Sequence, residues 1–231
     1  GIRDSSTSRG LGVCIRDRDK KKLKIMSVGC GPCTELAAVD YLRNEGVLNY
    51  DQLDYRGIDP LGEVWQPIWN DIREYYGNEI KFYPNDILQL VDIIVKHSWV
   101  PDVLIFQYVF SDMYKHSDEE EIIQFINKLA EFLNSYEEKP IYILCNDINL
   151  SKSMGGGREF FDILESKIME PKIVRKMHFD NINKDRHYEY GEQYDSNVLV
   201  FNNISDEIKN AYNPFESCAS AQILIKKERK K

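Results

Sequence analysis

Glycines and aspartates that could hold a nucleoside follow three successive apolar segments of this sequence. Gly29 and Gly31 come directly after the apolar run Leu23–Val28, and a helical pattern begins behind them. Glycines let the backbone pass close to a ligand, and the N-terminus of a helix favours a polar or anionic group. Asp59 ends the next apolar segment, and its two carboxylate oxygens match the vicinal hydroxyls of a ribose.

Asp86 ends the third apolar segment and is followed by Ile87. Its carboxylate could accept a hydrogen bond from the exocyclic amine of adenine, while the isoleucine covers the ring face. Each aspartate could instead only cap the helix that follows it. A dinucleotide fingerprint would place its third glycine at position 34, where this chain has Thr34, so the pattern is not the one that binds a pyrophosphate. The glycines, Asp59 and Asp86 follow one another in the order that one adenosine requires.

Alternating strand and helix patterns supply the elements that would position these residues. Short apolar runs predict strands at Leu23–Val28, Tyr55–Ile58, Ile80–Tyr83, Val103–Val109 and Ile141–Cys145. Helical spacing of apolar residues predicts helices at Thr34–Asn44, Trp65–Tyr76, Ile87–His97, Ser117–Leu133 and Arg158–Met169. Ser117 is expected to cap its helix, in a capping box with Glu120. This alternation predicts a doubly wound parallel sheet, in which ligands bind beyond the carboxyl ends of the strands.

Segments at four of these strands resemble the motifs of the class I S-adenosylmethionine-dependent methyltransferase family. Lys24–Pro32 resembles its first motif, Arg56–Asp59 the second, Tyr83–Ile87 the third and Asp102–Gln107 the fourth, so the resemblance covers roughly residues 24–149. It implies an α/β fold with a Rossmann-like, doubly wound sheet of seven strands, whose last strand, Gln222–Lys227, is antiparallel. It also implies S-adenosyl-L-methionine as cofactor and methyl transfer as activity.

The resemblance assigns the cofactor site to the first four strand ends. The residues are Gly29, Cys30, Gly31, Pro32, Glu35, Asp59, Asp86, Ile87 and Gln107. Two positions depart from the family pattern: Ser27 stands where an acidic residue is common, and Cys33 where a glycine is common. Glu35 could replace the missing carboxylate as partner of the cofactor's ammonium, or it could only favour the helix dipole.

Two other functions compete with methyl transfer. Cys30-Gly31-Pro32-Cys33 matches the redox motif of the thioredoxin family and also lies between a strand and a helix. Against redox activity, Gly29 replaces the tryptophan that usually precedes the first cysteine, and Asp59 and Asp86 would be unexplained. The second competitor is a regulatory protein that binds S-adenosylmethionine without catalysis, because the cofactor residues are clearer than the catalytic ones.

Polar residues after the fourth and fifth strands could act on a methyl acceptor. The catalytic candidates are Tyr108, Asp112 and Asn146, with Asp147 and Asn149 beside them, and each could instead only stabilise a loop. Methyl transfer from a sulfonium is an in-line displacement, so the protein mainly aligns the reacting atoms. Residues Phe106–Phe110 lack the polar-Pro-Pro-aromatic and Pro-Cys motifs of DNA methyltransferases. A small molecule, a protein or an RNA remains as the acceptor.

The composition excludes a surface that binds nucleic acid through a broad positive field, because the net charge is −8. Nucleic acid could be bound only through the local basic segments Arg16–Lys24 and Lys226–Lys231. The five cysteines are a poor disulfide framework, which predicts reduced thiols, and no cysteine or histidine spacing predicts a metal site. Without a membrane-spanning run or a signal-peptide core, the chain is expected in the cytoplasm, with no membrane partner.

The expected organisation is a basic N-terminal extension at residues 1–22 and a single methyltransferase domain at residues 23–231. Residues 178–215, which are rich in polar residues and tyrosine at their start, could form an insertion that recognises the acceptor or only a surface loop. The glycine-rich segment Ser151–Gly157 could fold over the site as a lid or serve as a plain connection.

Overall fold

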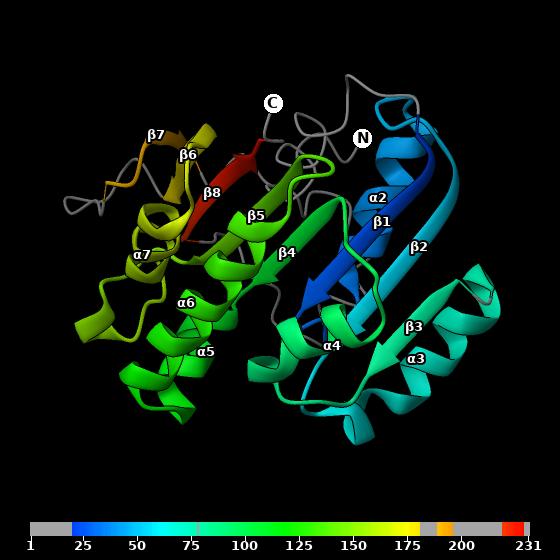
Figure 1. Cartoon of the computed structure of the whole chain (residues 1–231), viewed down its shortest axis with the longest axis horizontal. Coiled ribbons are helices and arrows are strands. Elements are labelled where there is room, and N and C mark those ends of the chain that lie inside the picture. Colours follow the sequence, from blue (N-terminus) through cyan, green and yellow to red (C-terminus); the bar gives the residue numbers. More distant parts are fainter. Residues whose placement is uncertain (1–19, 78, 181–188, 196–218, 229–231) are drawn as a thin grey trace, which may run out of the picture.

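The computed structural model describes residues 20–77, 79–180, 189–195 and 219–228. These residues form a single mixed sheet with the strand order β3-β2-β1-β4-β5-β8-β6-β7 (Figure 1). The strands are β1 (Lys20–Val28), β2 (Tyr50–Ile58), β3 (Ile80–Tyr83), β4 (Val103–Gln107), β5 (Ile141–Ile148), β6 (Pro171–Asp180), β7 (Glu192–Asp195) and β8 (Ser220–Lys227). The sequence also predicts an extended segment at Val198–Phe201 and a short helix at Ser205–Ala211, and both lie outside the described residues.

The strand directions confirm the predicted fold class. Strands β1 to β5 are mutually parallel, and β8 runs antiparallel to both β5 and β6. The described part of the sheet has eight strands where the sequence predicts seven, because β7 pairs with β6 at the sheet edge. Residues Glu192–Asp195 contain no apolar run, and Tyr194 stacks on Phe179 with ring centroids 5.5 Å apart. An edge strand needs only one pairing partner and one packed side chain, so apolar periodicity does not reveal it.

Helices cover both faces of the sheet, as a doubly wound fold requires. They are α2 (Thr34–Asn44), α3 (Gly62–Tyr76), α4 (Leu90–Lys96), α5 (Val109–His116), α6 (Glu119–Ser135) and α7 (Glu159–Lys167), with 3₁₀ turns η1 (Ile87–Gln89) and η2 (Lys152–Met154). Successive strand residues point to opposite faces, so Met26 packs in the cluster with α4 to α7 while Ile25 packs with α2 and α3. None of the described helices is long and apolar enough to span a membrane.

Helix α5 is missing from the sequence-based prediction, which continues the fourth strand to Val109. The strand ends at Gln107, because Tyr108 adopts a left-handed conformation with φ 58° and turns the chain into α5. Val109 is buried in a helix as it would be in a strand, so the apolar run does not distinguish the two. The capping box of α6 also lies one residue later than predicted, at Asp118 with Glu121.

Part of the basic N-terminal segment belongs to the sheet. Strand β1 begins at Lys20 and pairs with β2 from Tyr50 onward, so the sheet starts three residues before the expected domain boundary. At the other end of the chain, Lys227 is buried and Lys226 forms an ion pair with Glu228 at 2.7 Å. The described lysines of the two basic segments are therefore largely built into strands.

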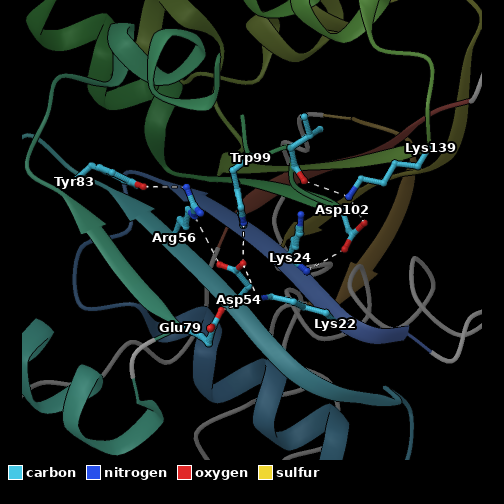
Figure 2. A network of polar contacts seen from close by, with 10 residues as sticks. Lys22, Lys24, Asp54, Arg56, Glu79, Tyr83, Trp99, Asp102 and Lys139 are labelled. Carbon is cyan, nitrogen blue, oxygen red and sulfur yellow. Dashed lines mark hydrogen bonds and ion pairs between the residues drawn. The ribbon is translucent and has the colours of Figure 1, made fainter. Parts of the chain in front are cut away.

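A polar network connects β2 to the segment after α4 (Figure 2). The Asp54 carboxylate accepts a hydrogen bond from Trp99 Nε1 at 2.8 Å and pairs with Lys22 at 3.2 Å. The Arg56 guanidinium lies over the Trp99 ring, 4.1 Å from its centroid, and 3.6 Å from Asp54. Lys22 also reaches Glu79 at 2.6 Å. Asp54 and Arg56 are only 5% and 7% exposed, so this network is a buried charge cluster that depends on its internal pairing.

Candidate functional site

A cavity of about 550 Å³ opens at the carboxyl ends of β1 to β4. This volume is in the range of small-molecule and cofactor sites. The lining residues that the sequence predicts are Gly29, Gly31, Asp59, Asp86, Ile87, Gln107, Tyr108 and Asp112. The others are Pro60, Leu61, Trp65, Leu88, Val109, Met113, His116 and Ser117. Residues from four strand ends, far apart in the sequence, thus meet at one cavity. The predicted residues Cys30, Pro32, Glu35 and Asn146 do not line it.

The glycine loop after β1 packs closely against α5 at Gly29. Gly29 has φ +63° and Gly31 has φ +46°, and a Cβ added to Gly29 would lie 2.8 Å from Val109 Cγ2. A side chain at Gly29 is therefore excluded by both conformation and space. Cys33, at the N-cap of α2, has φ 60°, the left-handed conformation that glycine adopts most easily. This conformation explains why a glycine suits position 33 in the family pattern.

Asp59 connects the ends of β1 and β2. Its Oδ2 accepts a hydrogen bond from the Gly31 N–H and its Oδ1 from the Leu61 N–H, both at 2.9 Å. The side chain is only 7% exposed, yet it lines the cavity. Each carboxylate oxygen can accept a second hydrogen bond, so the group can hold the loop and still bind donors in the cavity.

Asp86 begins the short turn η1 after β3. Its Oδ1 accepts a hydrogen bond from the Leu88 N–H at 2.9 Å, so the capping role considered from the sequence is present. Its side chain also lines the cavity, next to Ile87 and Leu88. The end of β3 thus offers a carboxylate beside two apolar side chains.

Glu35 points into the protein core below the glycine loop. It is 3% exposed and accepts hydrogen bonds from the Tyr55 hydroxyl and the Ser27 side chain. Burial raises the pKa of the Glu35 carboxyl, and these hydrogen bonds partly oppose the rise. At position 27, where an acidic residue is common in the family pattern, this chain thus has a serine that hydrogen-bonds to the Glu35 carboxyl.

Gln107 brings an unpaired acceptor to the cavity. It ends β4 and lines the cavity, and its Oε1 is buried with no hydrogen-bond partner among the described residues. A buried carbonyl oxygen without a partner is costly, and most such atoms are paired. This atom is suited to accept a hydrogen bond from a bound ligand.

The candidate catalytic residues occupy different environments. Tyr108 is 39% exposed at the cavity wall, and Asp112 lies on α5 with His116 Nε2 3.8 Å from its Oδ1. Asn146 is buried, its Oδ1 accepts from Gln222 Nε2 at 2.9 Å, and its backbone oxygen accepts from the Tyr108 N–H at 2.7 Å. Asn146 does not line the cavity itself; it pairs with the lining residues Tyr108 and Gln107 across the β4–β5 ladder.

Several lining residues are not identified by the sequence analysis. Trp65 belongs to the apolar stripe of a predicted amphipathic helix, and it lines the cavity while also packing against the core cluster of β1, β2 and α2. Met113 and His116 belong to α5, which lies between the predicted strand that ends at Val109 and the predicted helix that begins at Ser117. Helical spacing of Val109, Met113 and His116 is the signal that could have revealed them.

The two cysteines of the glycine loop are in an environment unlike that of a redox motif. Cys30 and Cys33 are both buried, and the Cys33 thiol donates to the Gly31 carbonyl oxygen at 3.6 Å. The hydrogen bond with Cys33 and burial raise the pKa of the Cys30 thiol. Thiol–disulfide exchange needs an accessible thiolate, and both features reduce its amount.

Alkylation of Cys30 is therefore expected to be slow in the folded protein. Because the raised pKa lowers the thiolate fraction at every pH below it, iodoacetamide at pH 8 should modify Cys30 at least about tenfold more slowly than in the urea-unfolded chain. Mass spectrometry of the peptide that contains Cys30 measures both rates. Equal rates in the folded and unfolded chain would contradict the burial of this thiol.

The glycine-rich segment Ser151–Gly157 is packed onto the protein. It forms η2 and a following turn, closed by backbone hydrogen bonds from Gly155 and Gly156 to Lys152 and Ser151. A Cβ added to Gly157 would lie 2.4 Å from Asp147 Oδ2. The segment does not line the cavity in this structure, and its packing agrees with the plain connection considered from the sequence.

Comparison with known proteins concerns the fold. No family model matches this sequence, and no curated protein sequence matches it. Among solved structures, a candidate S-adenosylmethionine-dependent methyltransferase from Streptococcus mutans has a TM-score of 0.51 at 11% identity, over 96% of this chain and 49% of its own. A candidate class I enzyme from Listeria monocytogenes has a TM-score of 0.48 at 14% identity, over 98% of this chain and 63% of its own.

A third solved structure, mitomycin 7-O-methyltransferase, has a TM-score of 0.47 at 13% identity, over 97% of this chain and 54% of its own. This chain thus spans less than two thirds of the length of these three proteins. The likeness to the Streptococcus mutans protein, together with the strand order, shows the fold of class I methyltransferases.

Proposed function

We propose, on the premise of this class I methyltransferase fold, that the protein binds S-adenosyl-L-methionine in the cavity and transfers its methyl group to an acceptor. One observation carries the proposal: the described residues that line the cavity include the carboxylates of Asp59, Asp86 and Asp112 and no lysine or arginine. S-adenosylmethionine carries a sulfonium, an ammonium and one carboxylate, so it is a net cation, and an acidic cavity attracts cations. The same lining would repel the pyrophosphate of a dinucleotide.

Each part of the cofactor has a suitable partner in the lining. We assign the ribose hydroxyls to Asp59, the adenine amine to Asp86, and the ring face to Ile87. The methionine part would lie along the glycine loop, of which Cys30 and Pro32 are part. We assign the ammonium to Gln107 Oε1, since this buried oxygen lacks a donor while Glu35 already accepts from two side chains.

The protein's own contribution to methyl transfer would be alignment and exclusion of water. The bound sulfonium supplies an activated methyl group, and rate follows from holding the nucleophile in line with it. Tyr108 and Asp112 are the lining residues that we assign to the acceptor side. Tyr108 keeps a strained φ of 58°, a feature typical of functional sites, and Asn146 holds its backbone. The acceptor is a small molecule, a protein or an RNA.

Calorimetric titration with S-adenosylmethionine tests the cofactor assignment. We expect micromolar-range binding to the wild-type protein and about tenfold weaker binding to Asp86→Ala, which loses one charge-assisted hydrogen bond. Asp92→Ala is the matched control, because Asp92 is exposed on α4 outside the cavity lining, and its affinity should equal that of the wild type. Absence of binding to the wild type would overturn the proposed function.

A regulatory protein that binds S-adenosylmethionine without turnover is a second candidate. It is favoured by the end of β5, where Asn146, Asp147 and Asn149 are buried and hydrogen-bonded to Gln222, Ser111 and Arg158. These side chains are engaged within the protein instead of facing an acceptor. Incubation with methyl-labelled cofactor and pooled small molecules, proteins or RNA distinguishes the candidates: bound cofactor without label transfer supports the regulator.

The proposal also includes the domain organisation, the cellular location and the contacts with nucleic acid. One methyltransferase domain would cover residues 23–231, and the 178–215 insertion would contact the acceptor; of this insertion the structure describes residues 178–180 and 189–195. A cytoplasmic location is supported by the free thiols of Cys30, Cys33 and Cys145. Contacts with nucleic acid would be restricted to the basic segments at the two ends of the chain.

A further inference from the structure

Two tryptophans of α3 approach the glycine loop from different sides. Trp69 is almost fully buried, its Nε1 donates to the Gly31 carbonyl oxygen at 2.9 Å, and its ring stacks on Phe82 at 4.7 Å. Trp65 lies one turn earlier, is partly exposed and lines the cavity. A Cβ added to Gly31 would lie 3.7 Å from Trp65 Cζ2 and 3.8 Å from Cε2, so the six-membered ring of the indole packs against the glycine. Trp69 therefore supports the loop from the core, whereas Trp65 forms part of the cavity wall.

The strand order places Trp65 near the sulfonium of the bound cofactor. This step rests on the proposed function, in which Asp86 at the end of β3 takes the adenine and Asp59 at the end of β2 takes the ribose. Neighbouring strands are about 4.8 Å apart, so the next part of the cofactor lies at the end of β1. The sulfonium is bonded to the carbon that follows the ribose ring. The end of β1 is the glycine loop, where the Trp65 ring packs on Gly31.

We propose that the indole of Trp65 binds the sulfonium through a cation–π interaction and so distinguishes S-adenosylmethionine from its product. The methylated cofactor is positively charged at sulfur, whereas S-adenosylhomocysteine is a neutral thioether of otherwise the same shape. An aromatic face attracts a cation within about 6 Å, and tryptophan does so most strongly. Because the Trp65 ring attracts only the positively charged sulfur, the site would bind S-adenosylmethionine more tightly than S-adenosylhomocysteine. This difference favours release of S-adenosylhomocysteine after each methyl transfer.

The test compares the affinities for both ligands in matched variants. Calorimetry with S-adenosylmethionine and with S-adenosylhomocysteine gives the ratio of the two dissociation constants for the wild type, Trp65→Leu and Trp65→Phe. Trp65→Leu should lower the preference for the charged ligand by about fivefold, and Trp65→Phe should retain most of it. Trp69→Phe is the control: it loses the hydrogen bond to Gly31, so it should lower the melting temperature and affect both ligands alike.

The possible results distinguish a failure of the proposed role of Trp65 from a failure of the proposed cofactor site. If Trp65→Leu weakens both ligands equally, the indole only packs against the ribose and the charge-sensing role is overturned while the cofactor site stands. An unchanged affinity for both ligands overturns any contact between Trp65 and the cofactor. If neither ligand binds the wild type, the proposed function itself fails, and the role of Trp65 fails with it.

Discussion

Asp59→Asn is expected to weaken S-adenosylmethionine binding by about 100-fold, which corresponds to about 2.7 kcal/mol. The carboxylate accepts hydrogen bonds from the Gly31 and Leu61 N–H groups at 2.9 Å, and the proposed ribose contact uses the remaining lone pairs of the same oxygens. Asparagine keeps the shape but has only one acceptor oxygen and no charge. The variant therefore loses ribose binding and loosens the loop that carries the methionine part.

Calorimetric titration measures this loss, and thermal unfolding shows whether the variant is folded. Asp71→Asn provides the control, because Asp71 is exposed on α3 and lies outside the cavity lining. It makes the same chemical change without touching the loop, so its affinity should stay at the wild-type value. An affinity of Asp59→Asn within about threefold of the wild type would show that this carboxylate does not bind the cofactor.

Asp54→Ala is expected to lower the free energy of unfolding by about 3–5 kcal/mol. The variant removes the acceptor of the Trp99 indole N–H and leaves the buried Arg56 guanidinium without its counter-charge (Figure 2). The cost comes mainly from the uncompensated buried charge, since an ion pair in the interior contributes little net stability while it is intact. Urea unfolding followed by circular dichroism measures the change.

Glu79→Gln is the matched control for the buried network. Glu79 also pairs with Lys22, at 2.6 Å, but its side chain is 54% exposed. Exposed ion pairs are worth about 1 kcal/mol or less, so this variant should remain close to wild-type stability. Neither Asp54 nor Glu79 lines the cavity, so both variants should keep wild-type cofactor affinity when folded. Equal stability of Asp54→Ala and Glu79→Gln would contradict the central role of Asp54.

Local patterns were sufficient to place the five parallel strands and to locate the ends of the first three. Runs such as Ile80–Tyr83 lie at the predicted positions because an apolar segment between turn residues has few other structures available. Gly29, Gly31, Asp59 and Asp86 each follow their strands directly, and the carboxyl ends of parallel strands meet at one edge. Once the fold class is known, these residues must therefore lie near one another.

The sequence by itself thus determined the fold class, the parallel strands with the antiparallel last strand, and the residues at the first three strand ends. Only the tertiary structure decided what each side chain faces. Glu35 turns toward Tyr55 instead of the cavity, Trp65 lines the cavity as well as packing on the core, and Tyr108 bends the chain from β4 into α5. The spacing of residues along the chain shows which face of a helix or strand a residue lies on. The side chains that this face contacts come from distant parts of the sequence. Their identity depends on packing, which no local pattern records.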